Sequence, residues 1–457
     1  MLKTLLAGAL VASMTVGAMA SDTSVNEQLK AMRAELDAVR ATNTQLQGEV
    51  AKLRSATDEN WLTERRAQEV KTLVAEVLND ADTRASLLEG GMSAGHNGKN
   101  FFLASEDGSF LLKIGGQFQF RHIWAHQDSS SSSADEDDTG FQIRRMKLKF
   151  GGHIGDPKLF YAINLEGNRD GGNVAINTTY VGYDFGNGFK VSFGKDKVPF
   201  LRQELISSSK QLAVDRSLVN EYFTLNYSDQ VKIDYKADNY KLALSLNDGS
   251  NGGLDDIGAD PVDFAIALRG EWLLAGSWSQ FADVTAWSGD DTGLLLGAAV
   301  FFSEGDAQNG GVADYTAWTV DGSFETGGVG LLVAYMGADI NPDSGTSVSP
   351  WGLLVEAGFQ IVPDKLEPFV RWEFIDHDSA SLEELQLLTF GLNWYLKKHN
   401  AKFTTDVMWV YDGNFGSNPF GASTYSDGLG FSESYSSSSG AVNDDIFVWR
   451  AQFQLLF

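Results

Sequence analysis

Two hydrophobic periodicities divide the chain, and the change between them comes near Phe110. Between Val25 and Leu53 the apolar residues recur at alternating steps of four and three, which is the a/d pattern of a heptad repeat. Asn43 occupies one a position, where a buried amide fixes the register of a coiled coil. The pattern predicts a coiled coil over residues 21–56, because a single amphipathic helix lying on another surface would need a wider apolar stripe.

A second helical stretch is predicted between Thr63 and Leu88, where apolar residues again recur at helical spacing. It ends at Glu89-Gly90-Gly91, which is typical of a helix stop followed by a flexible linker. We therefore assign residues 57–108 to a helix and a linker.

From Phe110 onward the period changes to two, as in strands that have one apolar and one polar face. In the last strand, Phe453, Leu455 and Phe457 share the apolar face, and the polar residues lie mainly on the other. About sixteen such strands are predicted. Their ranges are 110–126, 140–155, 158–168, 173–185, 188–198, 230–236, 239–247, 262–272, 292–303, 313–325, 328–338, 351–362, 366–377, 385–397, 400–412 and 444–457.

The connections between these strands tend to alternate between long and short. Antiparallel outer-membrane barrels place tight turns at the periplasmic end and long loops outside, and an even number of strands returns the chain to the side where it began. The connection 273–291 is long at a short position, which leaves room for an additional pair of strands. The fold class predicted for residues 109–457 is an all-β transmembrane barrel of about sixteen antiparallel strands, preceded by an N-terminal α-helical coiled-coil segment.

Residues 1–20 have the pattern of a secretory signal peptide, with Lys3, an apolar run and the small-residue sequence Ala18-Met19-Ala20. No other window holds the roughly 18 apolar residues that a spanning helix needs. We therefore expect the barrel in the outer membrane and the N-terminal segment in the periplasm. The terminal strand with Phe453, Leu455 and Phe457 resembles the signal that outer-membrane insertion machinery recognises, so we expect that machinery as a partner.

The net charge of −26 is distributed unevenly. Residues 109–220 carry 14 basic and 12 acidic residues, whereas residues 221–457 carry 10 basic and 34 acidic residues. This balance argues against a nucleic-acid partner. Many of the acids fall in predicted outer loops, where solvation explains them, and bridging through divalent cations to lipopolysaccharide is the alternative. Outer-membrane lipid and lipopolysaccharide are expected partners.

Catalysis has little support in the sequence. The chain has no cysteine, which excludes disulfides, thiolate metal sites and cysteine nucleophiles. The six histidines lack the spacing of zinc ligands. We expect no catalytic residue, no metal site and no cofactor, and we do not expect an enzyme.

Strand alternation turns a group of basic side chains towards the predicted lumen: Arg121, Arg145, Lys147 and Lys149. The segment 199–229 is the best candidate for a loop folded into the pore, and it carries Arg202, Lys210 and Arg216. Cationic ladders serve anion pores because fixed charges replace the hydration of the anion. The alternative is that these bases simply balance lumenal acids, namely Glu166, Asp196, Glu204 and Asp215.

Three stretches resemble the phosphate-selective porin O and P family: 140–150, 194–200 and 215–220. The resemblance implies a sixteen-stranded trimeric porin with an inward loop and with arginine and lysine residues that guide anions. It implicates Arg144, Arg145, Lys197 and Arg216. The candidate pore-lining and anion-guiding residues are therefore Arg121, Arg144, Arg145, Lys147, Lys149, Lys195, Lys197, Arg202, Lys210 and Arg216.

The function that follows is an outer-membrane porin for passive diffusion of small hydrophilic solutes, with small anions preferred and phosphate as a candidate, in a homotrimer. Two alternatives stay open. The pore could be unselective, since residues 109–457 carry 24 basic and 46 acidic residues. The barrel could also be a membrane anchor whose coiled-coil stalk tethers the outer membrane to the cell wall.

Overall fold

The computed structural model describes residues 22–60, 91–127, 136–167, 172–250, 262–305, 314–342, 346–380, 382–413, 415, 419–420 and 445–457. The chain divides into two units, residues 1–89 and 90–457. The expected signal peptide and the second predicted helix, 63–88, lie outside the described residues.

In the first unit the described residues, 22–60, form the helix α1 (Asp22–Asn60), of 39 residues. Met32, Leu36, Val39 and Leu46 belong to the predicted heptad seam, and each is at least 53% exposed. The helix is confirmed, and these four seam residues are uncovered in the single chain. The coiled coil stays a prediction. Within the described part of the chain, no helix is both long and apolar enough to span a membrane.

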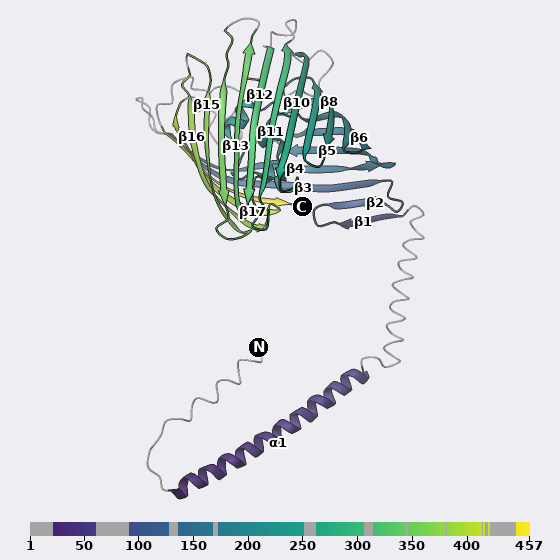
Figure 1. Ribbon diagram of the computed structural model, residues 1–457, viewed down its shortest axis with the longest axis vertical. Helices are drawn as coiled ribbons and strands as arrows, with labels where there is room; N and C mark the ends of the chain where they lie inside the picture. The colour runs from purple at the N-terminus through teal and green to yellow at the C-terminus, as the bar shows by residue number, and fades with distance from the viewer. Residues whose placement is uncertain are drawn as a thin grey trace. The chain divides into compact units, whose positions relative to one another are not determined.

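The second unit is a closed antiparallel barrel (Figure 1). Of the 18 strands in its sheet, β1 and β2 form a hairpin and the other 16 make the wall, which closes where β18 pairs with β3. The wall strands are β3 (Leu111–Gln127), β4 (Glu136–Ile154), β5 (Asp156–Gly167), β6 (Val174–Gly186), β7 (Phe189–Lys197), β8 (Tyr227–Lys236), β9 (Tyr240–Asn247), β10 (Val262–Ala275), β11 (Gly293–Gly305), β12 (Asp314–Thr326), β13 (Val329–Asn341), β14 (Trp351–Phe359), β15 (Leu366–Asp376), β16 (Leu385–Lys397), β17 (Ala401–Asp412) and β18 (Ile446–Leu456). The predicted barrel is confirmed, and no predicted strand end differs from the observed one by more than four residues.

The strands close into a barrel because lipid offers no hydrogen bonds to a free strand edge. Each wall strand is paired on both sides, so its backbone groups are satisfied within the sheet. The period of two sends large apolar side chains outward. Phe390, Trp394 and Leu396 on β16 are more than half exposed, whereas Thr389 and Asn393 on its other face are fully buried.

A short hairpin before the barrel was not predicted. It consists of β1 (Met92–His96) and β2 (Phe101–Ser105), and β2 pairs with residues 111–114 of β3. On that edge of β3, β18 ends opposite Gln117 and the Phe457 carbonyl accepts a 2.6 Å hydrogen bond from the Gly116 amide. The hairpin thus continues the edge pairing where the last strand stops, inside the range that the sequence assigned to a linker.

Two fully described connections fold into the barrel. The segment 198–226 contains α3 (Arg202–Leu205), η1 (Ser208–Lys210) and α4 (Leu218–Phe223), and most of its side chains are buried. We call it the inward loop, and its prediction is confirmed. The segment 276–292 contains η2 (Gln280–Ala282) and buries Phe281 and Trp287. The extra strand pair allowed at this position is absent from this fully described stretch, because these residues enter the barrel instead of lengthening its wall. We call them the second insert.

Candidate functional site

A β-bulge places two consecutive arginines on the inside of the barrel. On β4, Arg145 pairs with Gln119 and Ile143 pairs with Phe120, so Arg144 is the extra residue. Strict alternation would turn Arg144 and Arg145 to opposite faces, whereas a bulge re-aims one of them. Both guanidinium groups therefore reach the same acceptor on the inward loop.

That acceptor is Asp215. Its carboxylate lies 3.2 Å from Arg121, 2.5 Å from Arg144 and 2.7 Å from Arg145. Burial raises the pKa of Asp215, but the three guanidinium groups outweigh burial and hold the pKa well below its usual value. Asp215 is therefore a carboxylate that fixes the inward loop to β3 and β4, and three positive charges share one negative charge.

A second ionic group joins the ends of the inward loop. Glu204 accepts hydrogen bonds from Lys197 at 2.9 Å and from Arg216 at 3.1 Å. Burial raises the pKa of Glu204, but Arg216 and Lys197 outweigh burial and lower the pKa to about 2. Burial and the nearby Glu204 carboxylate raise the pKa of Glu221. Ion pairs and short helices thus both stabilise the folded conformation of the inward loop.

A polar cavity of about 240 Å³ opens between this group and the wall. Its lining includes five basic side chains, Arg144, Arg145, Lys147, Lys195 and Arg216, and three acidic ones, Glu166, Glu204 and Glu221. Within it, Lys147 forms a 2.7 Å ion pair with Glu166. The cavity has the size and the basic excess to hold a small hydrated anion.

The two remaining basic residues of the inward loop connect it to the second insert. Arg202 donates to the Phe281 carbonyl and lies 3.7 Å from Glu271. Lys210 donates to the Ala282 carbonyl at 3.3 Å. These two side chains hold the inserts together.

The structure thus divides the predicted basic residues into two sets. Arg121, Arg144, Arg145, Lys147, Lys197, Arg202 and Arg216 pair with carboxylates. Lys149, Lys195 and Lys210 make no ion pair within the described part of the chain, and Lys149 donates instead to Gln117. Glu166, Glu204 and Asp215 therefore balance the charge of most, but not all, of the predicted basic residues.

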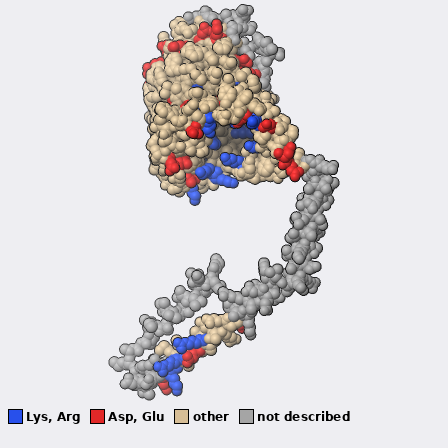
Figure 2. All heavy atoms as spheres, turned by 45° about the vertical axis from the view of Figure 1, so that its right-hand side comes forward, with Lys and Arg blue, Asp and Glu red and all other residues tan. Residues whose placement is uncertain are grey.

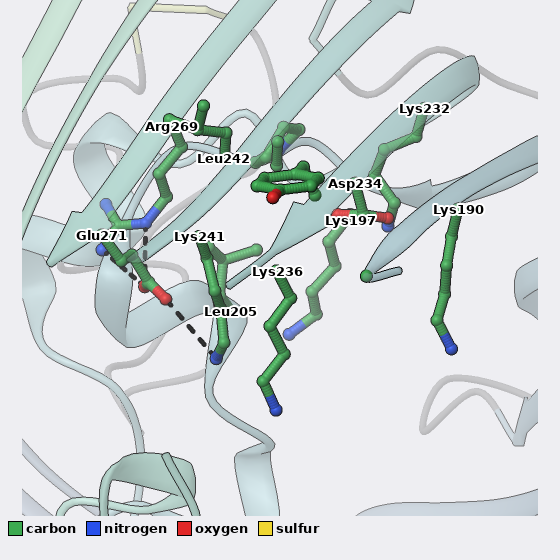
Figure 3. Close-up of a pocket in the computed structure, with 14 residues that line it drawn as sticks. Lys190, Lys197, Leu205, Lys232, Asp234, Lys236, Lys241, Leu242, Arg269 and Glu271 are labelled. Carbon is green, nitrogen blue, oxygen red and sulfur yellow. Dashed lines mark hydrogen bonds and ion pairs between the residues drawn. The ribbon is translucent and has the colours of Figure 1, made fainter. Parts of the chain in front are cut away.

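Another basic cavity, of about 300 Å³, lies against β7 to β10 (Figure 3). Its lysines are Lys190, Lys197, Lys232, Lys236 and Lys241, and its acids are Asp234 and Glu271. Lys232 pairs with Asp196, and Lys241 lies 3.8 Å from Glu271. Only Lys197 was predicted for this site. The same alternation rule, applied to strands 230–236 and 239–247, would have found Lys232, Lys236 and Lys241.

Basic side chains gather visibly in the hollow of the barrel unit. Figure 2 shows Lys and Arg in blue inside the opening, although the chain as a whole is acidic.

A closed barrel of 16 strands with a loop folded inside and a polar lumen is the architecture of a porin. Residues 117–259 match the family described as phosphate-selective porin O and P, so the resemblance is confirmed over this segment, which includes the inward loop. An uncharacterized protein of Aquifex aeolicus (strain VF5) is 25% identical over 284 residues, which cover 56% of this chain and 64% of that protein. The chain thus spans less than two thirds of that relative's length.

Solved structures support the fold. The anion-selective porin from Comamonas acidovorans superposes with a TM-score of 0.50 at 13% identity, over 76% of this chain and 99% of that one. Pseudomonas putida OprB superposes with a TM-score of 0.50 at 8% identity, over 75% and 94% of the two chains. At these identities the likeness concerns the barrel and not the solute.

Proposed function

We propose that this protein is an outer-membrane porin through which small hydrophilic solutes diffuse passively, with a preference for anions. One observation carries the proposal: both cavities between the inward loop and strands β4 to β10 are lined by more bases than acids. A fixed excess of cations beside open space raises the local concentration of anions.

The balance around Asp215 supports the same preference. Three guanidinium groups face the Asp215 carboxylate there, and the adjoining cavity is lined by five basic and three acidic side chains. Lys195 adds an unpaired ammonium group among the described residues lining the cavity. The competing proposal, an unselective pore, draws its support from the pairs Lys147–Glu166 and Lys197–Glu204.

The remaining parts of the chain fit this proposal. Residues 1–20 would direct export, the terminal strand ending at Phe457 would be read by the insertion machinery, and residues 21–108 would lie in the periplasm. The exposed seam of α1 would bring chains together as a homotrimer, in contact with lipid and lipopolysaccharide at the barrel surface.

Reversal potentials across planar lipid bilayers in a KCl gradient test the preference. The wild-type pore should favour chloride, and Arg145→Glu combined with Lys147→Glu should reduce that preference. A matched control is Lys158→Glu with Lys365→Glu, which makes the same charge change at two exposed positions near tight turns. Potassium preference in the wild type would refute the anion proposal but leave a porin.

A second candidate function rests on the exposed apolar seam of α1. A stalk of this kind would let the barrel tether the outer membrane to the cell wall. Deleting residues 21–90 separates the two functions. A porin without the stalk should still conduct in bilayers, whereas loss of a tether should leave cells that shed outer-membrane blebs.

A further inference from the structure

The two halves of the barrel wall carry opposite charges on their inner faces. Among the described strand residues, the fully buried charged side chains of β3 to β10 are all basic: Arg121, Arg145 and Arg269. Those of β11 to β18 are mainly acidic: Asp321, Glu325, Glu356, Glu367, Glu373 and Asp406, with Arg371, Lys402 and Arg450 among them. A pore with both walls open would present both signs to a passing ion.

The inward loop contacts both halves, and on the acidic half it covers three carboxylates. The amide of Val214 donates to Asp406 at 3.0 Å, and the amide of Val219 donates to Glu373 at 3.0 Å. Gln203 lies 3.5 Å from Glu356. Each of these three carboxylates is at most 2% exposed, so the loop both covers and hydrogen-bonds them.

Basic and amide side chains of the acidic half donate hydrogen bonds to backbone carbonyls of the inward loop. Arg371 donates to the Asp215 carbonyl at 3.1 Å, and Lys402 donates to the Gln211 carbonyl at 2.7 Å. Asn393 donates to the Leu212 carbonyl at 2.8 Å. These contacts attach the middle of the loop to β15, β16 and β17.

The second insert covers the next carboxylate. The Tyr395 hydroxyl donates to Glu367 and accepts a 2.9 Å hydrogen bond from Thr285, whose hydroxyl oxygen lies 3.5 Å from Glu367. Glu367 is fully buried as a result. Both inserts thus lie over carboxylates, while the cavities of 240 and 300 Å³ remain beside the basic half.

We infer that the two inserts act as an electrostatic shield, which covers the carboxylates of β14, β15 and β17 and leaves the cavity-lining lysines of the basic half to determine which ions pass. The inference rests on the proposed porin function. The inference attributes ion selectivity to the position of the two inserts and not to the charges that they carry. Residues 201–223 carry three basic and three acidic residues, so this part of the loop contributes no net charge.

The shield is useful because charges in a wide aqueous pore act only over short distances. At physiological ionic strength screening limits exposed charges to roughly 8 Å. The covered carboxylates are buried and paired with wall arginines, Glu356 and Glu373 with Arg371 and Asp406 with Arg450, so mobile ions do not reach them. A lysine beside open water stays accessible to those ions. Covering one wall therefore changes selectivity without changing the net charge.

The loop can be removed with little disturbance of its ends. The Val198 amide donates to the Asn226 carbonyl at 3.1 Å, so a Gly-Ser-Gly link in place of residues 201–223 joins positions that are already adjacent. Because the chain has no cysteine, single cysteines then report which wall is open to water.

Thr389→Cys tests the covered wall. Thr389 is fully buried on the inner face of β16, opposite Arg371 in the register with β15. In the full-length protein this cysteine should react with a charged methanethiosulfonate reagent at least tenfold more slowly than after loop replacement. Asn177→Cys, which faces the 240 Å³ cavity, is the matched control and should react at similar rates with and without the loop.

The chloride-to-potassium permeability ratio is the second measurement. Glu356→Gln with Glu373→Gln should change the chloride-to-potassium permeability ratio less than twofold while the loop is present, and should raise it severalfold when the loop is replaced. Equal effects in both backgrounds, or fast labelling of Thr389→Cys in the intact protein, would overturn the shield. Absence of any conductance would refute the porin proposal instead, and the labelling result would still decide the shield.

Discussion

The barrel half formed by β3 to β10 and the half formed by β11 to β18 have the same outside and different insides. Both present apolar side chains such as Phe193 and Phe390 to lipid, because an outward charge in the bilayer is costly. Among the described strand residues their buried inner charges differ: arginines in the first half, and twice as many carboxylates as bases in the second. The difference teaches that lipid dictates one face of each strand and leaves the other free to carry function.

The inward loop connects these halves, and Asp215 is where it meets the basic one. Asp215→Ala should give the largest effect, because it leaves Arg121, Arg144 and Arg145 without their shared carboxylate. Removing one partner of a buried ion pair costs about 3–5 kcal/mol. Denaturant unfolding in detergent measures the loss. Asp234→Asn, which neutralises a cavity carboxylate for which no ion pair is found among the described residues, is the control and should cost much less.

The two halves also meet where β18 closes onto β3. A Cβ on Gly116 would lie 2.2 Å from the ring of Phe457, so Gly116→Val should displace that ring and weaken the closure by about 1–3 kcal/mol. The same unfolding assay applies, and the yield of folded barrel in membranes should fall. Gly140→Val is the control, because a Cβ there meets nothing within 4 Å. Equal stability of both variants would contradict the role of this contact.

The basic half should determine selectivity through its unpaired lysines. Lys149→Glu with Lys195→Glu should lower the chloride-to-potassium permeability ratio about fivefold at low salt, since a unit charge at about 4 Å in water contributes roughly 1 kcal/mol. The effect should shrink as salt screens the charges. On the acidic half, Glu367→Gln should change the ratio far less while the inserts are in place. A larger effect from Glu367→Gln would reverse the comparison.

Acid should have the smallest effect over the ordinary range. The pKa values of Asp215 and Glu204 are lowered in the fold, so these loop carboxylates stabilise it above their unfolded pKa values, near 4. That stabilisation is lost as the pH falls through the folded values, which for Glu204 is about 2. The stability that Asp215 and Glu204 give to the inward loop should therefore stay nearly constant from pH 8 to 5. Loosening of the loop at pH 6, detected as new labelling of Thr389→Cys, would contradict this prediction.

The sequence alone determined the barrel. Alternation in stretches such as 110–126 and 444–457, and the regular exchange of short and long connections, predicted the sixteen wall strands with every end within four residues of the observed one, because lipid requires a strict period of two on the outer face. It also identified the inward loop and the facing of Arg121, Arg145 and Lys147, since a strand residue's face follows from its position.

Tertiary structure decided everything that departs from that period or joins distant strands. The bulge that turns Arg144 inward depends on the register with β3, and the hairpin β1–β2 depends on the edge that β18 leaves free. The meeting of three arginines at Asp215, and the position of both inserts over the carboxylates of the far wall, are contacts between residues up to nearly two hundred positions apart. No local pattern encodes such contacts, because closure of the barrel brings them together.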